Sequence, residues 1–160
     1  QEGFSRSPDD VSIQRLVGFA ISPPLKRAFG DPMTTPNVMR ALFVEIGKTP
    51  ETDQFFVLNY DGEFSNHVGF AIAAGSDTAE AAMRDSLAAH DDVPTLQVAI
   101  ERAKSAFRAG LSRMVDEDEP EYEGDLLEDA LKTGQIEAAI LERNSPRESK
   151  FRLLAASEVD

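Results

Sequence analysis

Gly75-Ser76-Asp77 is the stretch whose residue types could most directly do chemistry. It stands where a predicted strand turns into a predicted helix, so its backbone N–H groups could hold an anion or its serine could be an exposed nucleophile. The flanking residues Ala74 and Thr78 do not complete a Gly-x-Ser-x-Gly elbow, and neither the P-loop nor the dinucleotide-binding glycine pattern occurs. We therefore interpret this turn as the N-cap of a helix and not as a catalytic site.

The two histidines, His67 and His90, are the other candidates for acid–base or metal chemistry. They do not form a His-Glu-x-x-His pair, so they are a poor zinc signal, and a Ser-His-Asp triad needs a geometry that one sequence cannot show. We interpret His67 as a polar residue at the end of a strand and His90 as a favourable charge at a helix C-terminus. The sequence predicts no catalytic, metal-binding or cofactor-binding residue.

Two groups of side chains could instead bind a partner. Arg147, Lys150 and Arg152 alternate with other residues near the last predicted hairpin and could form a small anion or partner site. We favour a solvated strand face as the explanation of these three basic residues. The second group is the apolar face of a predicted helix, which we interpret as core or subunit interface: Leu96, Ile100 and Phe107.

Composition limits the class of protein. The chain has 160 residues, of which 41% are hydrophobic, and no cysteine, which predicts one globular domain without disulfides or thiol chemistry. Its apolar runs are shorter than the ~18 residues that a membrane-spanning helix needs. The first residues do not resemble a signal peptide, and without an initiator methionine we expect the chain to begin inside a longer gene product.

The net charge of −13 is concentrated in one segment. Residues 116–129 carry nine acidic side chains and no Lys or Arg, whereas the rest of the chain carries 20 acidic and 16 basic residues. This balance argues against a nucleic-acid-binding surface, which needs a cationic face. Pro120 stands where an EF-hand has alternating ligands, so we interpret the segment as a solvated acidic loop and not as a calcium site.

The first half of the chain predicts a helix and three strands. Asp9-Asp10 can cap the helix, and Pro23-Pro24 should stop or kink it, with one last turn at residues 25–29 before Gly30 as a possible C-cap. Asp61-Gly62 is a strong hairpin signal, after which Phe64 can start the return strand. The three strand-like runs are residues 38–46, 54–60 and 67–74.

The second half predicts three helices and a closing hairpin. Asp77 with Glu80 has the spacing of a capping box before a helix at residues 79–89, and Thr95 can cap a second helix that Gly110 closes. A short helix, Leu126–Leu131 with Gly134 as its cap, and strands at residues 136–141 and 151–154 complete the order. Short turns between strands and paired helices favour an α+β fold with antiparallel sheets.

Three consecutive runs in the middle of the chain resemble the middle of a proteasome core-particle subunit. They are residues 38–46, residues 55–62 (FFVLNYDG) and residues 69–76 (GFAIAAGS), which matches a strand, a strand ending in an Asp-Gly turn, and a strand ending in a Gly-Ser turn before a helix. Residues 94–100 (PTLQVAI) are similar to the family's Thr-Leu-x-x-Ala-Ile helix start. The segments most similar to α-type, especially actinobacterial, subunits are residues 136–143 and 150–154.

This resemblance covers residues 10–159 and implies the fold of N-terminal nucleophile hydrolases, a four-layer α-β-β-α sandwich with antiparallel sheets. It implies a non-catalytic α-type subunit that forms a seven-membered outer ring on a β ring, gates substrate entry, and docks a ring ATPase or other activator in the cytoplasm. The helices at residues 77–89 and 95–111 are the expected ring contacts. No cofactor, nucleic acid or membrane is implied.

Only the later part of such a subunit has a counterpart here. The family's first strands and first helix, its gating extension, and the residues that assist its N-terminal threonine nucleophile belong to the unmatched part, and Gln1 has no nucleophilic side chain. No catalytic residue can therefore be assigned. Because both sheets of the family fold use strands from the unmatched part, we expect that these 160 residues do not fold stably alone, and that a longer polypeptide or a second chain supplies the strands.

Two other functions stay open. The chain could be part of a β-type threonine protease subunit, which an N-terminal threonine in the unmatched part would favour. It could also be a free-standing acidic adaptor that uses residues 116–129 to bind a basic partner, in which case binding would be lost in salt or on neutralising the segment.

Overall fold

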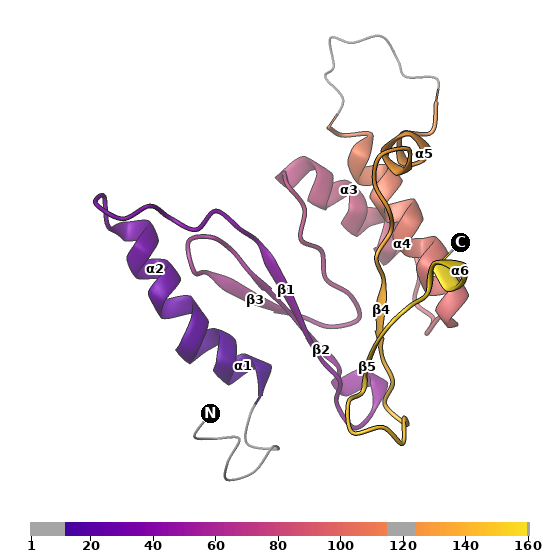
Figure 1. The fold of residues 1–160 in the computed structure, drawn as a ribbon, viewed down its shortest axis with the longest axis horizontal. Helices are drawn as coiled ribbons and strands as arrows, with labels where there is room; N and C mark the ends of the chain where they lie inside the picture. Colours follow the sequence, from indigo (N-terminus) through magenta and orange to yellow (C-terminus); the bar gives the residue numbers. More distant parts are fainter. Residues whose placement is uncertain (1–11, 115–123, 160) are drawn as a thin grey trace. The chain divides into compact units, whose positions relative to one another are not determined.

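A computed structural model describes residues 12–114 and 124–159 of the chain, shown as a ribbon in Figure 1. Its residues form two compact units, Gln1–Ala73 and Ala74–Asp160, which we describe one at a time. The predicted caps Asp9-Asp10 and most of the acidic segment, residues 115–123, lie outside the described residues. The interpretation of the chain as one domain stays a prediction.

The first unit begins with three helical segments that follow one another without a break: α1 (Ile13–Arg15), the π-helical segment Leu16–Ile21, and α2 (Ser22–Gly30). Ser12 caps the start, because its side chain accepts a hydrogen bond from the backbone N–H of Arg15. Glu45 also accepts from the backbone N–H of Ile13 at 2.7 Å, which fixes the start of the helix to a strand. Gly30 is the last helical residue and not a C-cap; the cap is Asp31.

Pro23 and Pro24 neither stop the helix nor end it early, contrary to the stronger form of the prediction. They occupy the first turn of α2, where a missing N–H is tolerated because it would have no helical partner. The backbone N–H of Ser22 reaches back five residues to the carbonyl of Val17, which makes the turn before the prolines wider than an α-helical turn. The helix thus changes its hydrogen-bond spacing at the prolines and continues.

The sheet of the first unit has three antiparallel strands in the order β1-β2-β3. Its strands are β1 (Ala41–Glu45), β2 (Gln54–Leu58) and β3 (Phe64–His67), with a short 3-10 helix, Pro50–Thr52, between the first two. The predicted hairpin turn is confirmed: Gly62 has a φ of +82°, and its N–H donates to the carbonyl of Asn59.

The third strand was predicted at residues 67–74, and this prediction is wrong. The tight turn at Gly62 places Phe64 directly opposite Leu58, so pairing starts at Phe64 and ends at His67. Gly69 then adopts a φ of +87°, which is incompatible with a continuing strand. Residues 68–74 form no strand in the structure.

The two faces of this sheet differ in what covers them. On one face the helix packs its apolar side onto the strands, forming a core of Val17, Leu25 and Leu58 with Phe43 against it. The opposite face is also apolar along β1 and β2, where Leu42 is exposed and Val57 is buried. A sheet that is apolar on both faces is typical of an inner layer that is covered on both sides.

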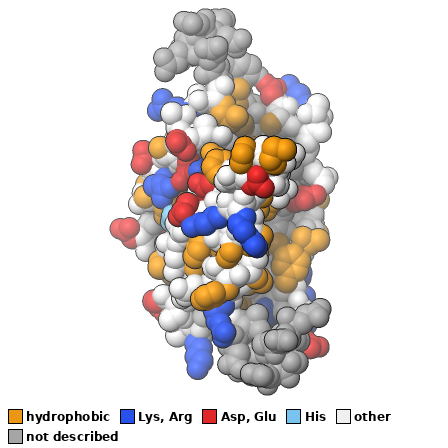
Figure 2. All heavy atoms as spheres, turned by 90° about the vertical axis from the view of Figure 1, so that its left-hand side faces the viewer, with side chains coloured by type: hydrophobic (Ala, Val, Ile, Leu, Met, Phe, Trp, Pro, Cys, Tyr) orange, Lys and Arg blue, Asp and Glu red, His pale blue; other side chains and the backbone are white. Residues whose placement is uncertain are grey.

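The outer side of the helix is only partly polar. Figure 2 faces the side of the molecule that carries α2 and shows hydrophobic side chains at the surface among Lys, Arg, Asp and Glu side chains. The most exposed large side chain of the π-helical segment is Phe19, at 82% exposure. Phe29 at the end of α2 contacts the ring of Tyr60, with 5.4 Å between ring centroids.

The second unit consists of four helices and one two-stranded antiparallel sheet over its described residues. The long helices α3 (Asp77–Ala88) and α4 (Leu96–Leu111) pack on each other, and α5 (Leu126–Leu131) lies against α4. The sheet is formed by β4 (Ala139–Leu141) and β5 (Phe151–Leu153), and α6 (Ala156–Val159) follows it. Both strands lie inside the predicted ranges, and α5 has the predicted bounds.

Helix caps and one glycine correct the predictions in this unit. The cap of α3 is Ser76, which accepts from the N–H of Ala79, so Asp77 is the first helical residue and not the cap. Thr95 caps α4 as predicted. Gly110 does not close α4; it is buried inside the helix, where a Cβ atom would lie 2.8 Å from Met83 of α3. Glycine is therefore required there for close helix packing.

The ribbon β4–β5 alternates in burial along both strands. Ile140 and Arg152 are partly buried on one face, whereas Ala139, Phe151 and Leu153 are exposed on the other. Phe151 is 52% and Leu153 66% exposed, so the exposed face of the ribbon is mostly apolar. Like the first sheet, this ribbon has the composition of a layer that is covered on both sides.

Candidate functional site

Ser76, the candidate nucleophile, acts as a structural residue. Its Oγ accepts from the backbone N–H of Ala79 at 3.2 Å and lies 3.2 Å from the Thr78 hydroxyl. No histidine is among the partners of Ser76 within the described part of the chain. The interpretation of this turn as a helix N-cap fits these contacts, with Ser76 in the capping position.

The histidines do not form a catalytic group either. His67 Nε2 lies 2.7 Å from the hydroxyl of Ser65, two positions back on the same strand face. Over residues 12–114 and 124–159, no carboxylate contacts the other ring nitrogen, so the orienting third member of a triad is missing there. The same residues contain no group of three His, Cys, Asp or Glu side chains placed to hold a metal ion.

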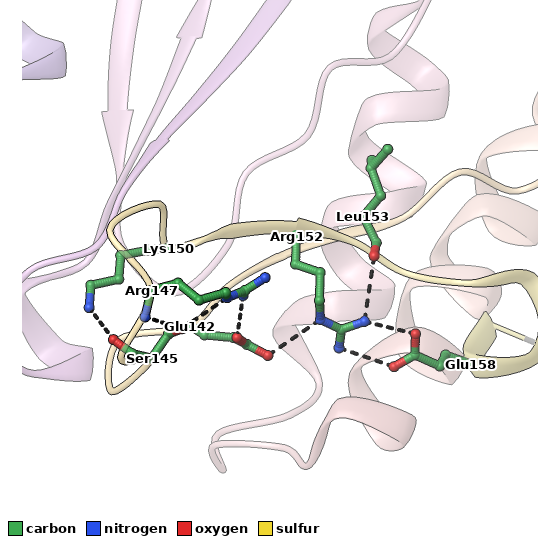
Figure 3. Close-up of polar contacts among 7 residues, drawn as sticks. All are labelled: Glu142, Ser145, Arg147, Lys150, Arg152, Leu153 and Glu158. Atoms are coloured by element: carbon green, nitrogen blue, oxygen red, sulfur yellow. Dashed lines mark hydrogen bonds and ion pairs between the residues drawn. The ribbon is translucent and has the colours of Figure 1, made fainter.

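The three basic residues near the last hairpin belong to one polar cluster, drawn in Figure 3. Arg147 pairs with Glu142, and the ammonium group of Lys150 donates to the backbone carbonyl of Ser145. Arg152 donates from Nε to Glu142 at 3.4 Å and forms a two-fold pair with Glu158: Nη1 lies 2.8 Å from Oε2, and Nη2 lies 3.0 Å from Oε1.

The cluster neutralises its own charges. Hydrogen bonds from Arg152, and one from the backbone N–H of Ala155, lower the pKa of Glu158 below its ordinary value. The same pair, with Glu142 as a weaker partner, raises the pKa of Arg152. Because these cations already have carboxylate or carbonyl partners, the cluster has the character of a structural clamp, not of an anion site.

An apolar groove of about 490 Å³ lies beside this cluster in the second unit. Helix α4 contributes Ile100 and Phe107, α5 contributes Leu127, and Val159 of α6 lies at the groove as well. The segment before β4 completes the lining with Gly134, Gln135, Ile136, Glu137 and Ala138. Ile100, Leu127 and Val159 are almost fully buried, whereas Phe107 is 47% exposed.

Two ion pairs position the walls of the groove. Asp125 caps α5 by accepting from the backbone N–H of Leu127 at 2.9 Å, and its other oxygen accepts from Arg108 of α4 at 2.8 Å. The bond to Arg108 is the main reason that the pKa of Asp125 is lowered. Lys104, the basic residue of the lining, pairs with Glu101 of its own helix at 3.1 Å. The groove therefore offers apolar contact and no unpaired cation among its described residues.

Sequence reasoning found part of this site. The helix face that was predicted to be core or interface supplies Ile100 and Phe107 to the groove. It missed α6 and its residues Glu158 and Val159 completely. The available signal was weak, because Glu158 is a single acidic residue six positions after Arg152. The whole arrangement defines a packing or binding surface and not a reaction centre.

The comparisons with known proteins point to a class whose members are subunits of an assembly. The chain is 26% identical over 157 residues to proteasome subunit alpha of Streptomyces avermitilis and 25% identical over 158 residues to that of Streptomyces scabiei. It is 30% identical over 152 residues to proteasome subunit alpha of Actinosynnema mirum. The resemblance to α-type, actinobacterial proteasome subunits is thereby confirmed.

The extent of the matches is one-sided. They cover 98%, 99% and 94% of this chain but 56%, 57% and 52% of the three relatives, so the chain spans about half the length of the curated relatives it matches. No protein-family model matches the chain, and no solved structure matches it. Among the described residues, no helix is long and apolar enough to cross a membrane.

Proposed function

We propose that this chain is, or is part of, an α-type subunit of a bacterial proteasome core particle. The observation that carries the proposal is the match of nearly the whole chain to actinobacterial proteins named proteasome subunit alpha. The order of elements supports it, because a helix, an antiparallel sheet, a helix pair and a closing hairpin follow one another as the resemblance implies. The role is structural, and peptide-bond hydrolysis takes place in a partner ring.

We propose the four-layer α-β-β-α sandwich as the fold of the complete subunit. Each unit supports this, because each contains a sheet with helices to one side and apolar residues on the opposite face. In the first unit that face includes Leu42 and Val57, and in the second it includes Phe151 and Leu153. An apolar sheet face is stable when a second sheet covers it, at a spacing of about 10 Å.

Further parts of the proposal come from the resemblance alone. The subunit would form a seven-membered ring with copies of itself, stack on a ring of β-type subunits, and work in the cytoplasm. It would gate substrate entry and dock a ring ATPase or other activator. The ring contacts proposed for helices α3 and α4 agree with their exposed side chains, such as Val98, which is 42% exposed at the start of α4.

Native mass spectrometry of the purified gene product, followed by release and weighing of its subunits, tests the proposal. A particle whose mass is a ring multiple supports it, and the released masses show whether the chain is longer than 160 residues or has a partner. A folded, lone species of 17.5 kDa would contradict it. In that case the acidic adaptor would become the leading hypothesis, and salt-sensitive binding to a basic partner would be its test.

The β-type threonine protease remains the second candidate. The relatives found here carry the name alpha, which favours the non-catalytic type. Mass spectrometry of the released subunits separates the two, because a β-type subunit would show a mature N-terminal threonine.

A further inference from the structure

Helix α6 is too short to keep its shape without help. It comprises only Ala156–Val159, and an isolated helix of this length is unstable in water because nucleation costs more than the few helical bonds return. Its position must therefore come from contacts with the rest of the unit. Two of its residues make such contacts, Glu158 through charge and Val159 through burial.

Glu158 fastens the helix through three hydrogen bonds. Its carboxylate takes both outer nitrogens of Arg152, at 2.8 and 3.0 Å, and also accepts from the backbone N–H of Ala155 at 2.9 Å. A planar guanidinium that meets a carboxylate in this two-fold way is the most directional ion pair that proteins form. Arg152 is itself held on β5 by Glu142.

Val159 converts this attachment into a wall of the groove. Its side chain is only 3% exposed and lies at the groove together with Ile100 and Phe107 of α4. Glu158 and Val159 are neighbours, so the ion pair and the apolar contact hold the same turn of helix. If the ion pair is lost, the apolar contact of one valine is all that keeps this turn in place.

We propose that the Arg152–Glu158 pair is a latch that keeps α6 closed against the apolar groove, and that releasing the pair opens the groove to apolar ligands. The latch is a conformational device of this unit and does not depend on the proposed proteasome function. It connects the polar cluster of the hairpin to the accessibility of an apolar surface.

Hydrogen exchange and dye binding on the full chain test the latch. The variant is Glu158→Gln, which keeps the size of the side chain and removes its charge; the matched control is Glu148→Gln in the exposed hairpin loop. We expect exchange of the amides of residues 155–159 to rise about two- to tenfold in Glu158→Gln, the range set by one well-formed exposed ion pair. Fluorescence of the dye 1-anilinonaphthalene-8-sulfonate should rise with it.

The control and a second variant decide between a latch and a general loss of structure. Glu148→Gln should leave both signals at the wild-type level, and Arg152→Lys should behave like Glu158→Gln because lysine keeps the charge but not the two-fold geometry. Equal exchange and dye binding in Glu158→Gln and Glu148→Gln would overturn the latch. Faster exchange throughout α3 and α4 would also overturn it, since it would show that the pair holds the whole unit together.

Discussion

Replacing Gly62 by alanine tests how tightly the β2–β3 hairpin is packed on the helix. Its φ of +82° costs an alanine about 1–2 kcal/mol. The new Cβ would also lie 2.7 Å from the carbonyl oxygen of Ser22 and 2.8 Å from the amide nitrogen of Lys26, both backbone atoms. Relieving such contacts costs about 1–3 kcal/mol, as overpacking does. We expect Gly62→Ala to lower the free energy of unfolding by about 2–5 kcal/mol, the sum of the strain and the overpacking.

Urea unfolding, followed by circular dichroism, measures this effect, and Gly69 provides the control. Gly69 has a similar φ of +87°, but nothing lies within 4 Å of the position that an added Cβ would take, so Gly69→Ala should cost only the backbone strain of about 1–2 kcal/mol. With a urea m-value of about 2 kcal/mol/M, the midpoint of Gly62→Ala should fall by roughly 1–2 M at an unchanged m-value. Equal midpoints for the two variants would refute the packing of the turn against the helix.

Three further predictions concern the core and one helix cap. Ser22→Ala removes the buried 2.6 Å hydrogen bond to the Gly62 carbonyl and should cost about 1–3 kcal/mol in urea unfolding; a double variant with Gly62→Ala that is fully additive would contradict a shared contact. Phe56→Ala, at a side chain 1% exposed, should cost about 3–5 kcal/mol, and a loss below about 1 kcal/mol would place Phe56 outside the core. The pKa of Asp125 is lowered mainly by Arg108, so its stabilisation is complete above the ordinary aspartate pKa of about 3.9 and is lost as the pH falls through the lowered value; Asp125→Asn should flatten the loss of thermal stability between about pH 5 and pH 2, and an unchanged slope would refute this.

Local signals in the sequence predicted most of the elements. The Asp61-Gly62 hairpin, the cap Thr95 and the bounds Leu126–Leu131 follow from residue types that have one dominant local use. Both sheets have the predicted antiparallel pairing. The confirmed resemblance depended on the order and spacing of these same runs.

The errors arise where a distant contact decides the structure. Gly110 has the composition of a helix end, but the close approach of Met83 from α3 explains it, and this neighbour is not visible in the sequence. The strand after Gly62 starts at Phe64 because its partner Leu58 is already in place. The groove and α6 could not be predicted, because they depend on how α4, α5 and the last hairpin come together.

The prolines of the first helix also have a consequence for how the helix forms. The carbonyl of Phe19 would accept from residue 23 in an α-helix or from residue 24 in a π-helix, and both are prolines without an N–H. The N–H of Ser22 is already given to Val17. The chain of backbone hydrogen bonds is therefore interrupted at Phe19, and cooperative growth cannot pass this point. Each half must nucleate separately, so the helix folds as two short cooperative units that only packing on the sheet joins into one.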